Sequence, residues 1–191
     1  MRPKLKLVSE EIVRWAFEVS LHKSDNWKIA FTNPTAGPWK RVMALDPAGA
    51  AGEVHRFEID EKRPDLIIYS DKYKVVVIVE AKPDLGGLST EEQIEKTSAL
   101  YGRLSSILKT KKNNAFWGGR SEYRYELGLL WGKKNETAQE VKNLAARYHR
   151  NNKSQISDVI CIRGISKNES IEHKVFWGIS DKKISMDAYQ S

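Results

Sequence analysis

The sequence has almost none of the residues that build disulfide frameworks and thiolate metal sites. Its 191 residues contain a single cysteine, Cys161, which excludes an internal disulfide and any cysteine-rich zinc site. Cys161 lies within the apolar run 159–162, so we expect a buried side chain and a reducing compartment. The four histidines are not at metal-ligand spacing, which favours structural roles for them.

Long apolar runs are missing as well. The first residues, MRPKLKLVSEE, contain no apolar core of a secretory signal, and no run approaches the roughly 20 residues of a transmembrane helix. We therefore expect a cytoplasmic protein without a membrane partner. The chain also has no P-loop, no GxGxxG fingerprint and no GxSxG elbow, which removes the usual signatures of nucleotide binding and serine hydrolysis.

What is present is an ordinary globular composition with an excess of basic residues. A hydrophobic content of 40% and a charged content of 30% are typical of a folded chain, and we predict a single domain over residues 1–191. The 32 Lys and Arg outnumber the 25 Asp and Glu, and the net charge of +7 attracts phosphate polyanions. Because many basic proteins bind no nucleic acid, function has to be argued from particular residues.

The most informative stretch is residues 63–82, RPDLIIYSDKYKVVVIVEAK. Its two runs rich in Val and Ile are separated by a short polar turn, which predicts a buried antiparallel hairpin. Asp65 opens the first strand, while Glu80 and Lys82 close the second, so all three meet at one end. Strand alternation puts Glu80 and Lys82 on one face. Two carboxylates at the edge of a dry core need a cation, and hard oxygen ligands suit Mg2+ or Mn2+.

Pro64-Asp65, fourteen intervening residues and then Glu80-Ala81-Lys82 resemble the signature of the PD-(D/E)XK nucleases. The resemblance covers residues 55 to 110 approximately. It implies a restriction-endonuclease-like α/β fold, in which α-helices flank a mixed central β-sheet. It also implies that Asp65, Glu80 and the main-chain carbonyl of Ala81 bind Mg2+, for which Mn2+ can substitute, and that Lys82 is the catalytic lysine. A structural salt bridge among the same charged side chains is the competing interpretation.

Three further polar residues are candidates for the same site. Glu10 lies in the first turn of a predicted helix that extends to about residue 22, where a helix-capping role competes with a site role. Glu58 lies in a predicted strand, residues 54–59, which we expect to pair with the strand from Asp65. Gln93 projects from the apolar side of the next predicted helix and needs a polar partner.

Two irregular segments, residues 24–54 and 109–124, are predicted to contact DNA as loops. Their cationic side chains can neutralise phosphates, and their Asn and Arg side chains can read base edges. The competing account is a solvated basic surface whose aromatic side chains pack onto the domain. The candidate DNA contacts are Trp39, Lys40, Arg41, Met43, Lys111, Lys112, Asn113, Asn114, Arg120 and Arg124.

The remaining elements are predicted from periodicity and capping signals. A core at about residues 55–135 is expected to continue into a capped helix and two final strands. The predicted segments are a loop over residues 83–87, a helix opened by Ser89 and ending near 109, a strand over 125–131, a helix opened by Thr137 and ending near 148, and strands over 157–165 and 173–180.

Together these features predict a Mg2+-dependent endonuclease that acts on double-stranded DNA. The resemblance and the symmetry of duplex targets favour a type II restriction enzyme, with each subunit of a homodimer cutting one strand of a palindromic site. The alternatives are a structure-specific nuclease, such as a Holliday-junction resolvase or a repair endonuclease, and a non-catalytic nuclease-fold module that binds DNA.

Overall fold

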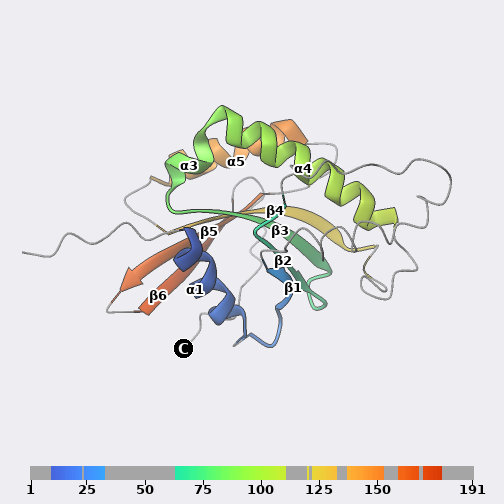
Figure 1. The fold of residues 1–191 in the computed structure, drawn as a ribbon, viewed down its shortest axis with the longest axis horizontal. Coiled ribbons are helices and arrows are strands. Elements are labelled where there is room, and N and C mark those ends of the chain that lie inside the picture. Colours follow the sequence, from blue (N-terminus) through green and yellow to red (C-terminus); the bar gives the residue numbers. More distant parts are fainter. Residues whose placement is uncertain are drawn as a thin grey trace, which may run out of the picture.

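Helices cover both faces of a mixed β-sheet in the computed structural model of the protein (Figure 1). The described strands are β1 (Lys28–Thr32), β2 (Leu66–Ser70), β3 (Val75–Lys82), β4 (Arg124–Trp131), β5 (Val159–Lys167) and β6 (Ser170–Trp177). The structure describes residues 10–22, 24–32, 63–110, 120, 122–132, 137–152, 159–167 and 170–177.

Strand order in the sheet follows the order of the strands along the chain, from β1 to β6. The pairs β1–β2, β2–β3 and β5–β6 are antiparallel, whereas β3–β4 and β4–β5 are parallel. Two parallel neighbouring strands need a crossover connection, which contains helices both between β3 and β4 and between β4 and β5. The predicted α/β class with a mixed sheet is therefore confirmed.

The β2–β3 hairpin forms as its sequence predicts. Leu66 pairs with Val79 and Ser70 with Val75, so the antiparallel register brings Asp65 beside the last residues of β3. The main-chain N–H of Asp65 extends the ladder by donating to the carbonyl of Val79 at 3.1 Å. Dense β-branched residues on both faces explain the burial, since β3 is buried from Val75 to Ala81.

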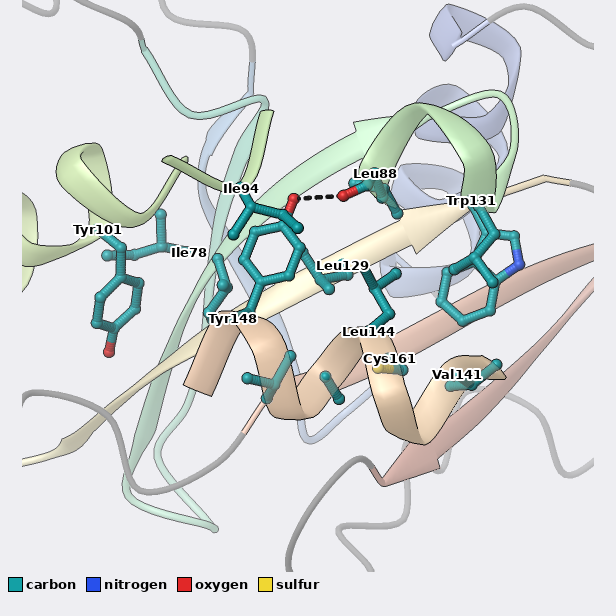
Figure 2. Packing of buried hydrophobic residues seen from close by; sticks show 14 of the residues in the cluster. Ile78, Leu88, Ile94, Tyr101, Leu129, Trp131, Val141, Leu144, Tyr148 and Cys161 are labelled. Atoms are coloured by element: carbon teal, nitrogen blue, oxygen red, sulfur yellow. Dashed lines mark hydrogen bonds between the residues drawn. The ribbon is translucent and has the colours of Figure 1, made fainter. Parts of the chain in front are cut away.

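The helices divide the core into two layers. α1 (Glu10–His22) packs on one face of the sheet, whereas α3 (Leu85–Ser89), α4 (Glu91–Thr110) and α5 (Ala138–Asn152) cover the other (Figure 1). Alternate residues of β3 serve the two layers: Val77 faces α1, and Ile78 faces α4 and α5. Figure 2 shows the second layer, in which the hydroxyl of Tyr148 donates to the carbonyl of Leu88 at 2.9 Å and ties α5 to α3.

Two segments that were expected to form loops contain regular secondary structure. β1 lies within residues 24–54, which were expected to form a loop, and it occupies the free edge of β2. Residues 54–59, which were expected to pair with this strand, lie outside the described residues, and β2 pairs with β1 and β3. The expected loop at 83–87 is replaced by α3, because the Asp84 carboxylate caps it by accepting from the Gly87 N–H at 2.9 Å.

Element boundaries elsewhere agree closely with the sequence. The box formed by Thr137 and Glu140 caps α5 as predicted, with hydrogen bonds in both directions. α4 is capped by the Thr90 hydroxyl, which accepts from the Gln93 N–H at 3.2 Å, instead of by Ser89. The sheet also extends beyond the predicted core, because β1, β5 and β6 lie outside residues 55–135. No helix in the described ranges has both the length and the apolar character needed to cross a membrane.

Candidate active site

Asp65 is fixed at the end of the hairpin by the backbone of β3. Its Oδ2 accepts the Ala81 N–H at 2.7 Å, a hydrogen bond that closes the first strand onto the second. The residue is half-buried and lies between Pro64 and Leu66, which are both buried. The strand ends thus present the Asp65 carboxylate beside Ala81, as the sequence predicts.

Glu80 is buried on the α4 side of β3 and is held there by Gln93. The Gln93 Nε2 atom donates to Glu80 Oε1 at 2.5 Å and to the hydroxyl of Thr97 at 2.9 Å. Glu80 is only 8% exposed, so this amide contact compensates part of the cost of burying a carboxylate. The polar partner expected for Gln93 is therefore Glu80.

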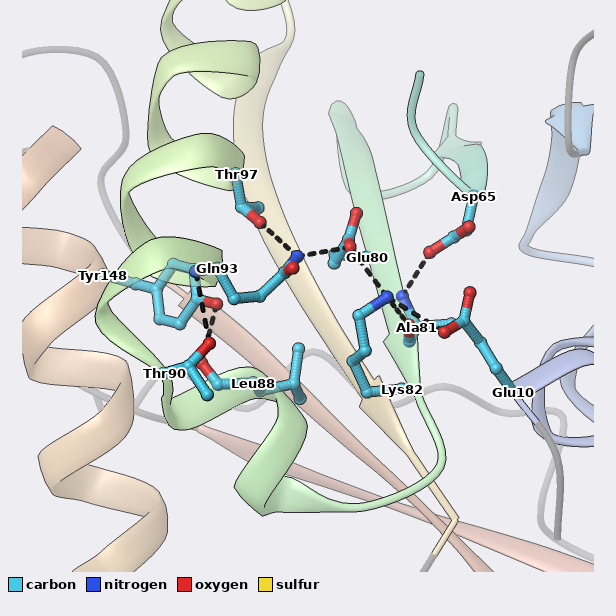
Figure 3. Close-up of polar contacts among 10 residues, drawn as sticks. All are labelled: Glu10, Asp65, Glu80, Ala81, Lys82, Leu88, Thr90, Gln93, Thr97 and Tyr148. Atoms are coloured by element: carbon cyan, nitrogen blue, oxygen red, sulfur yellow. Dashed lines mark hydrogen bonds and ion pairs between the residues drawn. The ribbon is translucent and has the colours of Figure 1, made fainter. Parts of the chain in front are cut away.

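Lys82 lies at the centre of the group. Its Nζ contacts Ala81 O at 2.8 Å, Glu10 Oε2 at 3.0 Å and Glu80 Oε1 at 3.1 Å. Glu10 reaches this point from the first turn of α1, on the opposite face of the sheet from α4. Figure 3 shows the three carboxylates of Glu10, Asp65 and Glu80, which we call the acid cluster, arranged around Ala81 and the Lys82 ammonium.

The charges of this group are unevenly balanced, with three carboxylates and one ammonium. Burial, together with the negative charges of Glu80 and Glu10, raises the pKa of Asp65 from 3.8 to about 7, against the opposing effects of the Ala81 N–H and Lys82. Burial also acts to lower the pKa of Lys82, but the Glu80 and Glu10 carboxylates outweigh it and hold the pKa above 10.5. Lys82 is therefore an ammonium at neutral pH, and the acid cluster retains excess negative charge.

The donor atoms fit a hard divalent ion. Within the described ranges, no three His, Cys, Asp or Glu side chains form a metal site by themselves. Mg2+, however, is commonly held by one or two carboxylates and keeps several waters. Among described residues, none donates to Asp65 Oδ1 or Glu80 Oε2, so each carboxylate has one oxygen fixed by the protein and one available. These two side chains and the Ala81 carbonyl would hold the ion, with water completing its shell.

Comparison of the chain with models of protein families, with curated proteins and with solved structures finds no match. Functional assignment therefore depends on the chemistry of the acid cluster and its surroundings.

Two of the predicted DNA contacts lie away from the acid cluster. Arg124 is exposed and pairs with Val75, seven positions before Lys82 in β3, which places it about 23 Å along the strand. Arg120 lies near the same end, where its Nε donates to Asp71 at 3.2 Å and its guanidinium lies 4.0 Å from the centre of the Tyr69 ring. The structure does not bring these arginines to the candidate site, and their role in DNA binding stays a prediction.

The other predicted contacts lie outside the described residues. They are Trp39, Lys40, Arg41, Met43, Lys111, Lys112, Asn113 and Asn114. Glu58, a candidate for the acidic site, also lies outside the described residues.

One residue of the site was missed. Thr97 is 2% exposed and accepts from Gln93, and it thereby helps to hold the amide that binds Glu80. A signal was present, because Thr97 follows Gln93 by four residues on a helix and so lies on the same face. That the Gln93 amide contacts both Thr97 and Glu80 depends on the position of α4 against β3, which the spacing alone does not give.

Proposed function

We propose that the protein is a Mg2+-dependent endonuclease that hydrolyses phosphodiester bonds of double-stranded DNA. Within this class, we propose a type II restriction enzyme. The observation that carries the proposal is the convergence of Asp65, Glu80, the Ala81 carbonyl and Lys82 at one end of the β2–β3 hairpin. The excess negative charge there fits a metal ion. The net charge of +7 on the whole chain fits a phosphate polyanion as the binding partner.

A restriction-endonuclease-like fold is part of this proposal. It is supported by an antiparallel hairpin, β2–β3, that is followed by parallel strands with crossover helices on one face. α1 covers the opposite face and contributes Glu10 to the site. A homodimer is the natural assembly, because two copies related by a twofold axis match the symmetry of a palindromic duplex.

The residues have distinct roles in the proposed reaction. Mg2+ bound at the acid cluster would promote ionisation of the attacking water and neutralise charge on the phosphorane. Asp65 and Glu80 would hold the ion, and Gln93, which donates to Glu80 Oε1, would keep that carboxylate in position. Because the pKa of Lys82 is raised, its side chain is suited to stabilising developing negative charge and poorly suited to accepting a proton from water.

A cleavage assay tests the proposal and separates the alternatives. Protein, Mg2+ and phage DNA are incubated, and the products are resolved on a gel beside a branched-DNA substrate. Discrete fragments from the phage DNA are expected of a restriction enzyme. Cleavage confined to the branched substrate would identify a structure-specific nuclease, and tight binding without cleavage would identify a DNA-binding module.

Lys82→Ala tests the role of the ammonium. We expect cleavage to fall at least about 100-fold, the scale for losing one group that stabilises transition-state charge, while duplex affinity changes only a few-fold. Lys96→Ala is the matched control, because Lys96 is an exposed lysine of α4 whose ion pair is with Glu92. Full turnover by the Lys82 variant would overturn the assignment of Lys82 as the catalytic lysine.

A further inference from the structure

The Lys82 ammonium lies among the oxygens that a metal ion needs. Of its three oxygen contacts, Ala81 O at 2.8 Å and Glu80 Oε1 at 3.1 Å belong to proposed metal ligands. The third, Glu10 Oε2 at 3.0 Å, belongs to the acid cluster as well. No other cation of the described residues forms an ion pair with these carboxylates, so the ammonium supplies their charge compensation.

A divalent ion and this ammonium would compete for the Ala81 carbonyl oxygen. An oxygen ligand lies about 2.1 Å from Mg2+, and the ammonium lies 2.8 Å from Ala81 O, so both cations on that oxygen would be at most about 5 Å apart. At that separation a double and a single positive charge repel strongly in a half-buried site. The partial negative charge of one carbonyl between them does not compensate for this repulsion.

We propose that the Lys82 ammonium is the built-in counter-ion of the acid cluster, and that a divalent ion binds by displacing it. The proposal rests on the metal site proposed above. Only the end of the side chain has to move, because its stem crosses Gly87, where a Cβ atom would lie 3.4 to 3.5 Å from three of the lysine carbons. Ion binding then releases the ammonium from Ala81 O and Glu80. The released ammonium becomes available to a scissile phosphate.

This exchange makes a prediction opposite to that for a lysine that merely supports the site. If the ammonium competes with the ion, replacing Lys82 by a neutral side chain raises the affinity for the ion. If the ammonium only positions the carboxylates, the same replacement leaves the affinity unchanged or lowers it. Loss of cleavage in the same variant does not distinguish these cases, so the measurement has to be metal binding.

Mn2+ serves as the probe, and its binding is measured without DNA at pH 8 by the loss of the free Mn2+ signal in electron paramagnetic resonance. The full-length protein is compared with Lys82→Met and with Lys82→Gln. We expect both variants to bind Mn2+ at least about tenfold more tightly than the wild type, because one competing charge has been removed. Lys96→Met is the matched control and should bind as the wild type does.

The outcomes separate this inference from the proposed function. Wild-type binding with equal or weaker binding by the Lys82 variants overturns the displacement and leaves the metal site standing. No Mn2+ binding by any of these proteins up to millimolar concentration overturns both. Circular dichroism establishes that each variant is folded, and Lys82→Gln, which keeps a polar end, provides the comparison if Lys82→Met does not fold.

Discussion

The surroundings of Asp65 disfavour the negative charge that an aspartate ordinarily carries at neutral pH. Burial and the neighbouring carboxylates raise its pKa from 3.8 to about 7. The folded state therefore binds more protons than the unfolded state between about pH 4 and pH 7, and the contribution of Asp65 to the free energy of unfolding falls as the pH rises through that window. Asp65 thus lowers stability at pH 8 relative to pH 5, while it retains the charge that a metal ligand needs.

Asp65→Asn removes this charge and keeps an oxygen that can accept the Ala81 N–H. We expect the free energy of unfolding at pH 8 to rise by roughly 1 to 3 kcal/mol and to change little at pH 5, where Asp65 is already protonated. Urea titrations without divalent ions at both pH values measure the difference. Asp25→Asn, at an exposed position, serves as control and should have little effect at either pH. A variant that is destabilised at pH 8 would contradict the assigned electrostatics.

At the same scale, the sequence predicted the chemistry of the site better than its contacts. Charges at the ends of two apolar runs were sufficient to bring together Asp65, Glu80 and Lys82, because a hairpin leaves little freedom in pairing. Gln93 was identifiable as a polar residue on an apolar helix face. Glu10 was named as a candidate for the site, but its contact with Lys82 depends on the position of α1 over the sheet, which is set by packing between residues far apart in the chain.

At the scale of elements, Gly132 controls how closely α1 approaches the sheet. It follows β4, and a Cβ atom there would lie 2.3 Å from the Cγ2 of Val13 in α1. Val13 is 1% exposed and its branched side chain has little rotational freedom, so it cannot move aside. The absence of a side chain at Gly132 therefore sets the position of α1 and, with it, that of Glu10.

Gly132→Ala should displace α1. We expect a loss of roughly 1 to 3 kcal/mol in the free energy of unfolding, the usual cost of overpacking a core. In the double variant Val13→Ala, Gly132→Ala, the new methyl group has room, so the combined loss should be smaller than the sum of the two single losses. Urea unfolding of the wild type, the two single variants and the double variant completes this double-mutant cycle. If the two losses in the free energy of unfolding are simply additive, Val13 and Gly132 do not interact in this way.

The elements that sequence missed are those with weak local patterns. β1 is a five-residue strand, KIAFT, with partly exposed residues, and its pairing with β2 is what makes it a strand. α3 contains two glycines, which predict a loop, but the Asp84 cap and the burial of Leu85 and Leu88 stabilise a helical turn. β2, β3 and β4 were predictable because their runs of apolar residues suit a buried sheet and little else.

At the scale of the whole molecule, carboxylates outnumber cations at one end of β3, and cations outnumber carboxylates, Asp71 among them, at the other. The acid cluster lies at one end of β3, whereas basic side chains surround the turn at the other end. Lys28 is 61% exposed there, and Lys72, Lys74 and Arg124 are exposed as well. With a net charge of +7, the molecule attracts a polyanion overall while it repels phosphate at the acid cluster until a cation is bound.

Duplex binding should accordingly depend strongly on salt. In EDTA, where cleavage is excluded by the proposed mechanism, we expect the dissociation constant for a 20-base-pair duplex to rise at least about tenfold between 50 and 200 mM NaCl. Fluorescence anisotropy with a labelled duplex measures it. Added Mg2+ should strengthen binding to Lys82→Ala, whose cleavage we expect to be at least about 100-fold slower. Affinity that is independent of salt would mean that phosphate contacts contribute little.

The agreement between strand order and chain order has a consequence for synthesis. Each described strand can join the edge of those made before it, so a chain leaving the ribosome need not insert any of them between two already paired. The residues of the acid cluster precede position 81, whereas β4, which covers the second edge of β3, begins at Arg124. The groups that act on the pKa of Asp65 by charge or hydrogen bonding all lie before residue 83, whereas its burial, the largest cause, depends on the folded sheet. We therefore expect Asp65 to acquire its raised pKa only as the sheet assembles.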